Sequence, residues 1–126
     1  MRRRGGWRGG RGGGPGQIRG FVQPALLLLL RRGAGHGYDL MNGLASIGFD
    51  QYPVDASTVY RTLDSLEAEG MVVSDRETES SLGPPRRVYR ITRQGEELLR
   101  TWVSQLRATD RVLHRFLEEY DKSVDG

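Results

Sequence analysis

The chain has 126 residues, no cysteine, histidine only at His36 and His114, and a net charge of +3. This length predicts one domain, and the composition argues against disulfides, a metal site and histidine-dependent catalysis. The longest apolar run, residues 25–30, is shorter than the roughly 20 residues that span a membrane, and no apolar segment directly follows the charged N-terminus. We therefore expect a cytoplasmic protein that is not an enzyme and needs neither cofactor nor metal.

Residues 1–20 are rich in glycine and arginine. Six arginines and no acid lie within residues 1–19, so the remaining residues hold 13 basic and 16 acidic side chains, a net charge of −3. The segment has too little apolar surface to offset the entropy of ordering, and we expect a disordered tail. Two interpretations stay open: the tail attracts phosphate without reading sequence, or it only keeps the protein in solution.

Two short helices are expected after the tail, with the folded part beginning near Phe21. Pro24 suits a first helical turn, and the apolar residues that follow predict a helix buried on most sides and ended by Gly33 or Gly35. A second helix is expected over residues 37–47, with apolar residues at core spacing.

The strongest local pattern belongs to a third helix. Asp55 can cap its first turn, and Gly70 can take the left-handed conformation that ends it. Val59, Leu63 and Leu66 fall on one side of the helical wheel and predict a core-facing stripe. Together with the two preceding helices, this helix has the sequence outline of a helix-turn-helix.

The opposite face of the third helix carries polar side chains. Ser57 and Arg61 lie near its start with Tyr60 on the flank, whereas Asp64 and the other acids lie in its second half. A helix that contacts a polyanion favours this order, because the N-terminal end carries partial positive charge. An ordinary amphipathic helix is the alternative, and the segment that follows decides between them.

That segment predicts a β-hairpin over residues 71–73 and 87–91, because both runs are rich in β-formers and a Gly-Pro-Pro turn at residues 83–85 lies between them. A hairpin directly after a helix-turn-helix makes a winged helix. Arg86 and Arg87 open the return strand and are placed to contact phosphate or the minor groove. The alternative is a solvated hairpin whose arginines pair with Glu77 and Glu79.

A long last helix is expected over residues 93–122, with Thr92 as its cap. At about 1.5 Å per residue it extends ~45 Å, well past a compact domain of this size. Its apolar seam, spaced alternately three and four residues apart with one interruption, comprises Leu99, Trp102, Leu106, Thr109, Leu113, Phe116 and Tyr120. The rest of the chain is too small to cover this surface, so we expect a homodimer. Folding back onto its own domain is the alternative.

Three segments together resemble the PadR family of bacterial transcriptional regulators. The matching motifs are His36-Gly37-Tyr38-Asp39-Leu40, Ser57-Thr58-Val59-Tyr60-Arg61-Thr62-Leu63 with Leu66-Glu67-Ala68-Glu69-Gly70, and Gly83-Pro84-Pro85-Arg86-Arg87-Val88-Tyr89-Arg90-Ile91-Thr92. The resemblance covers about residues 20–120, with the motifs in order and at the family's spacing. Two departures are the Gly/Arg tail and the start of the third helix, which reads Asp55-Ala56 where the family commonly has proline.

The resemblance implies a dimeric regulator, usually a repressor relieved by a small effector, that reads a palindromic DNA operator with its third helix and wing. By position the DNA contacts fall to Ser57, Thr58, Tyr60, Arg61, Arg86 and Arg87. The dimer interface falls to Leu99, Trp102, Leu106, Leu113, Phe116 and Tyr120. An aromatic or drug-like effector between the first and last helices would contact Phe21, Trp102, Leu106 and Phe116, whose alternative role is dimer packing.

The expected fold is therefore mainly α with a small β-hairpin wing: a winged helix-turn-helix followed by a long C-terminal dimerisation helix. The expected organisation is a tail over residues 1–20, a DNA-binding domain over residues 21–92 and a dimerisation helix over residues 93–122. The expected function is sequence-specific transcriptional regulation through double-stranded DNA. The alternative is a winged-helix protein-interaction module whose Arg/Gly tail binds nucleic acid without sequence preference.

Overall fold

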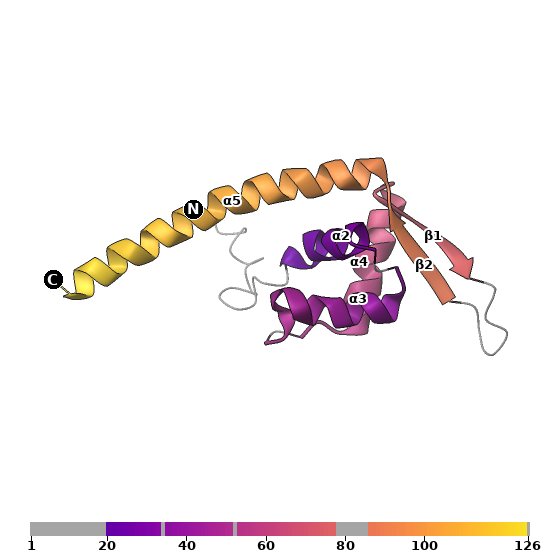
Figure 1. Cartoon of the computed structure of the whole chain (residues 1–126), viewed down its shortest axis with the longest axis horizontal. Coiled ribbons are helices and arrows are strands. Elements are labelled where there is room, and N and C mark those ends of the chain that lie inside the picture. The colour runs from indigo at the N-terminus through magenta and orange to yellow at the C-terminus, as the bar shows by residue number, and fades with distance from the viewer. Residues whose placement is uncertain (1–19, 34, 52, 78–85, 126) are drawn as a thin grey trace, which may run out of the picture.

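The computed structural model describes residues 20–33, 35–51, 53–77 and 86–125. In chain order the elements are α2 (Val22–Arg31), α3 (Gly37–Leu44), the π-helical turn η3 (Ala45–Phe49), α4 (Ala56–Ala68), β1 (Val72–Glu77), β2 (Arg86–Ile91) and α5 (Arg93–Asp125). Figure 1 shows α2, α3 and α4 packed together beside the first part of α5, with the hairpin projecting where α5 begins. This architecture confirms the predicted winged helix with a long C-terminal helix. The Gly/Arg tail and the loop at residues 78–85 lie outside the described residues.

The core forms around α2, the helix predicted to be buried on most sides. Seven of its ten residues are buried, and it packs against α3, α4, β2 and α5. The predicted stripe of α4, Val59, Leu63 and Leu66, is fully buried against it. Because α2 is apolar on most sides, α3, α4, β2 and α5 all pack against it. This shared packing positions α4 relative to the hairpin.

Both predicted ends of α4 are confirmed. The Asp55 Oδ1 atom accepts a hydrogen bond from the Thr58 backbone N–H at 3.0 Å, which satisfies an amide that has no partner within the helix. At the other end Gly70 has φ +81°, a backbone conformation that glycine adopts without strain, and the Met71 N–H donates to the Leu66 carbonyl. These two signals act locally, so they determine the helix without help from distant contacts.

The second helix differs from its prediction. Regular α-helix ends at Leu44 instead of continuing to residue 47, and the π-helical turn η3 follows, with Ile47 outside helical geometry and Gly48 at φ +111°. This turn brings Phe49 into the core, where the ring is buried. Burial of an aromatic ring offsets the irregular backbone that delivers it.

The hairpin is longer than predicted. β1 runs to Glu77 rather than ending at residue 73, because its polar half pairs with β2 through the backbone in a register from Val72 opposite Ile91 to Glu77 opposite Arg86. The other edge of β2 is also occupied. The Tyr89 N–H donates to the Gly35 carbonyl at 2.8 Å, and His36 forms a bridge with Val88. The sequence did not predict this contact, which joins the start of α3 to the hairpin.

The last helix begins as predicted and ends three residues later, at Asp125 instead of residue 122. The Thr92 Oγ1 atom accepts a hydrogen bond from the Gly95 N–H at 3.0 Å and so caps the first turn. Its first part packs on α2 and β2, whereas Figure 1 shows the remainder continuing beyond the body of the protein. Within the described residues, no helix has the length and apolar character needed to span a membrane.

Candidate nucleic-acid interface

The outer face of α4 presents most of the residues predicted to contact DNA. Ser57, Tyr60 and Arg61 are exposed, whereas Thr58 is half-buried. The Arg61 Nη2 atom donates to the Thr58 hydroxyl at 3.3 Å, so this arginine lies along the first turns of the helix. Asp64 is exposed one turn later, which keeps the acid at the C-terminal side of this surface.

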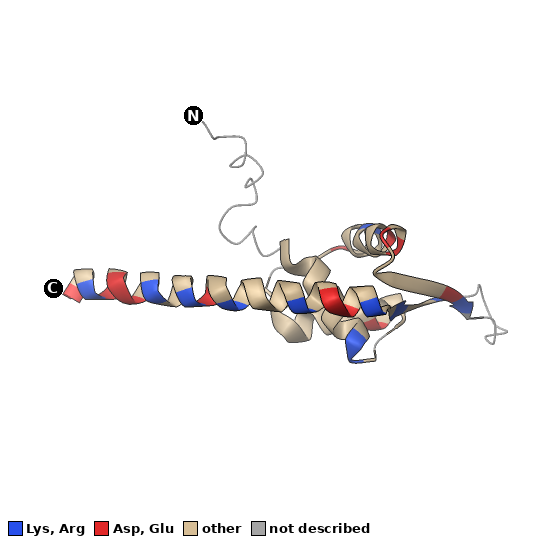
Figure 2. Cartoon of the chain, turned by 90° about the horizontal axis from the view of Figure 1, so that it is seen from above, with Lys and Arg blue, Asp and Glu red and all other residues tan. Residues whose placement is uncertain are grey.

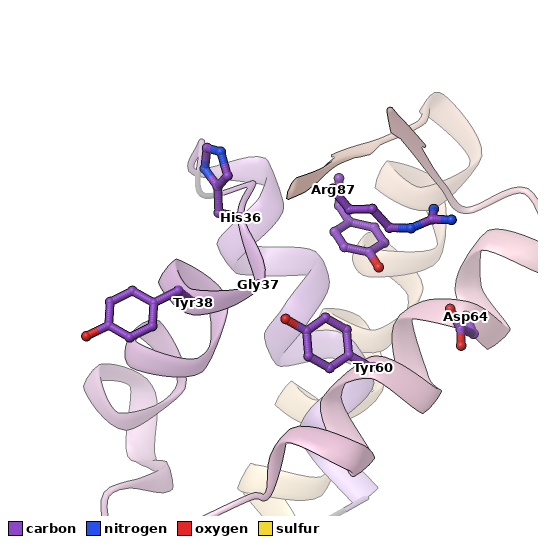
Figure 3. Close-up of a pocket in the computed structure, with 7 residues that line it drawn as sticks. His36, Gly37, Tyr38, Tyr60, Asp64 and Arg87 are labelled. Atoms are coloured by element: carbon purple, nitrogen blue, oxygen red, sulfur yellow. The ribbon is translucent and has the colours of Figure 1, made fainter. Parts of the chain in front are cut away.

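Tyr60 leans toward the start of α3 rather than pointing straight away from α4. A Cβ atom built on Gly37 would collide with the Tyr60 hydroxyl, so only glycine leaves room for the ring in this position (Figure 3). The sequence placed Tyr60 on the flank of the outer face, and this contact with α3 accounts for its direction.

On the wing, Arg87 is exposed and is held by a short hydrogen-bond relay. Its Nη1 atom donates to the Ser74 hydroxyl at 2.6 Å, and that hydroxyl donates to Glu67 of α4 at 2.8 Å. The relay therefore ties the hairpin to the second half of α4. The guanidinium keeps further N–H groups for an external acceptor.

In the described part of the wing one arginine pairs with an acid, but with Asp75 rather than with Glu77 or Glu79, so the alternative interpretation of the wing stays a prediction. The Arg90 Nη2 atom lies 2.6 Å from Asp75 Oδ2, and both side chains are mostly exposed. Arg86 lies opposite Glu77 in the strand register, but the side chains of both residues lie outside the described part of the structure, as does Glu79. Arg90 thus serves the hairpin, and Arg87 is the wing arginine that turns toward α4.

An open groove of about 850 Å³ lies where α4, the start of α3 and β2 meet (Figure 3). It is lined by His36, Gly37, Tyr38, Tyr60, Asp64, Arg87 and Tyr89. The DNA-contact prediction included Tyr60 and Arg87 but missed the other five. Tyr38 is a large exposed phenol at a helix start, which is a detectable signal in the sequence, whereas Tyr89 reaches the groove only because Gly35 and His36 pair with β2.

Tyr89 is the one described residue with a clearly shifted proton affinity. Burial raises the pKa of its phenol, with Asp64, Glu67 and Tyr60 adding to the rise and Arg87 opposing it. The phenol is therefore a neutral hydrogen-bond donor throughout the physiological range.

The seam predicted on α5 divides into two parts. Leu99 is buried in the core of its own chain, and Trp102 is half-buried, with its Nε1 atom donating to Gln23 Oε1 of α2 at 2.8 Å. Beyond Leu106 the apolar side chains are exposed within the chain: Val112, Leu113, Phe116, Leu117, Tyr120 and Val124. Charges of both signs alternate along the rest of α5 (Figure 2), so this helix does not offer a polyanion a surface of one sign.

A scan against protein-family models matches residues 26–101 to the transcriptional regulator PadR-like family. The match spans more than half of the chain, including α4 and the hairpin. The chain belongs to the PadR-like family. Its members are transcriptional regulators, and this assignment excludes an enzyme.

Solved structures agree with the family assignment. A conserved protein of unknown function and potential transcriptional factor is 31% identical, with TM-score 0.73, over 86% of this chain and 95% of that one. A transcriptional regulator from Clostridium thermocellum is 27% identical, with TM-score 0.70, over 79% and 92%. A PadR-like transcriptional regulator from Bacillus cereus is 25% identical, with TM-score 0.68, over 80% and 95%. No curated protein sequence gives a match.

The effector residues expected from the PadR resemblance do not meet within one chain. Phe21 is half-buried beside the core and Trp102 contacts α2, but Phe116 follows Trp102 by 14 residues, or ~21 Å along α5. The groove between α2 and α5, about 580 Å³, is lined by other residues: Leu28, Arg31, Glu96, Leu99, Arg100, Val103, Ser104 and Arg107. A site containing Phe21, Trp102 and Phe116 therefore needs α5 of a second copy.

Proposed function

We propose that this PadR-like regulator binds a palindromic DNA operator in a sequence-specific way, as a homodimer. In this proposal α4 of each protomer enters a major groove and the wing contacts the flanking backbone. Ser57, Thr58, Tyr60 and Arg61 act on α4, and Arg86 and Arg87 act on the wing.

The observation that carries the proposal is the arrangement of α4. Its capped N-terminal half exposes hydroxyls and Arg61, and its acids lie in the other half. The hairpin is tied to the same helix through the relay from Arg87 to Glu67, so the two DNA-contacting elements are held in one geometry. A helix with donors at its positive end, next to a rigidly held arginine, suits a polyanion with base edges exposed in a groove.

The proposed dimer rests on the distal part of α5. Phe116 is 63% exposed and lies in a stripe with Leu113, Leu117 and Tyr120, which the described residues of the chain leave uncovered. A contiguous apolar stripe on a helix marks an interaction surface. A second α5 is the simplest cover, because a twofold dimer buries the same stripe on both chains and gives two copies of α4 for two half-sites.

We further propose that the protein represses transcription and that a small aromatic or drug-like molecule relieves repression. Phe21, Trp102 and Leu106 of one chain with Phe116 of its partner would form the site. A ligand there can weaken DNA binding only through a difference in its affinity for the DNA-bound and free dimers.

The direct experiment is selection of duplexes from a randomised pool by the full chain, followed by footprinting of the enriched sequence. We expect one palindrome to be enriched and both of its half-sites to be protected. Enrichment without any common sequence would refute specific recognition and favour the alternative function, in which the Arg/Gly tail binds nucleic acid without sequence preference. A reporter gene downstream of the palindrome then tests repression, and rising expression with the protein present would contradict it.

A further inference from the structure

The groove between α4, the start of α3 and β2 contains a donor without an acceptor. Tyr89 lines the groove and is only 3% exposed, and its hydroxyl makes no hydrogen bond with any residue that the structure describes. Buried polar groups are nearly always hydrogen-bonded, because the lost contact with water is otherwise uncompensated. An unpartnered phenol at the floor of an open groove therefore favours an acceptor that binds from outside.

Two other side chains that line the groove, Tyr60 and Arg87, are also donors. The Tyr60 hydroxyl has no partner among the described residues, and the Arg87 guanidinium is fixed by Ser74 with N–H groups to spare, whereas the Tyr38 phenol points away from both (Figure 3). Phenols and a guanidinium together suit a ligand that only accepts hydrogen bonds and carries negative charge.

Asp64 determines which ligand fits best. Asp64 lines the same groove from α4, and its carboxylate repels an anion bound near it. The charges of Arg87 and Asp64 therefore nearly cancel within the groove. A small free anion gains little net attraction from such a site. A phosphodiester within a duplex is different, because contacts elsewhere along α4 hold it in place and the groove has only to supply hydrogen bonds.

We propose that this groove holds one backbone phosphate of each operator half-site, with the hydroxyls of Tyr89 and Tyr60 and the Arg87 guanidinium as its donors. The inference rests on the proposed function and adds Tyr89 to the DNA contacts. It also gives Gly37 a role, since a side chain there would displace Tyr60 from the groove. Because phosphate contacts carry no base information, these residues set affinity and register, and Arg61 is left to read bases.

The test compares Tyr89→Phe and Tyr60→Phe with the control Ser104→Ala, which removes one exposed hydroxyl from α5, on the selected palindrome and on a random duplex. Each groove variant loses one hydroxyl, and Tyr60 is 43% exposed, so its variant should fold normally. We expect each groove variant to bind both duplexes about tenfold more weakly, which is the effect of one hydrogen bond to a charged group. The ratio of its affinities for the palindrome and the random duplex should stay unchanged. The control should bind as the wild type does. Wild-type affinity in both groove variants would overturn the proposal.

The folding of Tyr89→Phe separates a ligand contact from a structural one. Removing an unpartnered buried hydroxyl leaves the packing of the ring intact, so the unfolding temperature of the DNA-free variant should not fall. A clear fall would show that the hydroxyl already has a partner within the protein, and the groove would then lose its strongest donor.

A single methylphosphonate moved along the palindrome locates the phosphate. With the wild type, we expect the methylphosphonate to lower affinity markedly at one position in each half-site. At that position the substitution should lower the affinity of Tyr89→Phe little further, because the two changes remove the same contact. Additive losses at every position would contradict the proposal. Saturable binding of inorganic phosphate to the DNA-free wild type, absent in Tyr89→Phe, would also overturn it by assigning the groove to a free anion.

The same experiments distinguish this inference from the proposed function. If the wild type enriches no palindrome, the proposed function fails and the groove assignment fails with it. If the wild type binds its palindrome and both groove variants bind equally well, only the groove assignment fails.

Discussion

The winged-helix body and the distal part of α5 use the same apolar residue types in opposite ways. In the body, Leu26, Leu27 and Leu63 are fully buried within one chain. In α5 beyond Leu106, leucine, valine and aromatic residues at helical spacing stay exposed, including Phe116. Helical periodicity therefore identifies which face is apolar, but what covers that face depends on how much chain lies near it.

A single helix joins the two regions. Gly95 and Leu99 of α5 are buried in the body, and a Cβ on Gly95 would collide with the Met71 carbonyl, so the start of α5 is held closely against the turn between α4 and β1. From there the helix continues without interruption to Asp125. In the proposed dimer, a rigid connection of this kind would transmit the orientation of one body to its partner, which reading two DNA half-sites requires.

The largest effect should come from a charge in the exposed stripe. Phe116→Glu places a carboxylate where we expect a desolvated aromatic contact, so the dimer should dissociate at micromolar concentration while the helical circular dichroism of the body persists. Sedimentation velocity measures the change. Ser104→Glu adds the same charge to the polar face of α5 and should remain dimeric. A dimeric Phe116→Glu would exclude this stripe from the interface.

In the body the corresponding change should act within each chain. Leu63 is 0% exposed, and Leu63→Ala leaves a cavity that should lower the free energy of unfolding by ~2–5 kcal/mol. Urea unfolding measures the loss, with the exposed Leu117→Ala as the matched control. We expect the effect of Leu117→Ala to vanish in a Phe116→Glu background, where no dimer forms, and the effect of Leu63→Ala to persist there. Equal losses for both variants in that background would contradict the contrast between the two regions.

The parts of the fold that the sequence predicted depend on local signals. Asp55 and Gly70 bound α4 correctly, because a cap and a positive φ act within one turn. The π-helical turn at Phe49 was missed because it depends on space in a core that distant elements create. The extension of β1 to Glu77 was missed because pairing with β2, and not the type of its side chains, makes it a strand.

The candidate interface divides in the same way. Ser57 and Arg61 were predicted because they lie on one face of one helix. The groove was not, because it joins Gly37, Tyr60 and Tyr89, three residues from different elements brought together by the pairing of Gly35 with β2. The direction of Arg87 also depends on a relay to Glu67 that no local pattern reveals.

At the interface itself, Arg61→Ala should weaken operator binding by ~1–3 kcal/mol if the guanidinium reads a guanine. A fluorescence anisotropy titration on the operator and on random duplex measures it, with Arg107→Ala on α5 as a control that loses the same charge. Equal weakening on both duplexes, with a shallower salt dependence, would assign Arg61 to phosphate instead. Operator binding at the wild-type level would remove Arg61 from the interface.

A smaller effect is expected at the cap of α4. Asp55→Ala removes the acceptor for the Thr58 N–H and should cost about 1 kcal/mol of stability. Asp55→Asn keeps an acceptor oxygen and should recover most of the loss. Thermal unfolding of the three proteins measures both effects, and an Asp55→Ala variant as stable as the wild type would show that the cap contributes nothing.

We expect the winged-helix body to bury its apolar core within one chain, and the distal part of α5 to bury its apolar stripe only against a second copy. Sedimentation equilibrium of the full chain, without DNA, measures this. At micromolar concentration we predict twice the 14.1 kDa mass of one chain for the wild type and the mass of one chain for Phe116→Glu. A wild type that sediments as a single chain throughout the micromolar range would contradict the dimer and, with it, the paired reading of a palindrome.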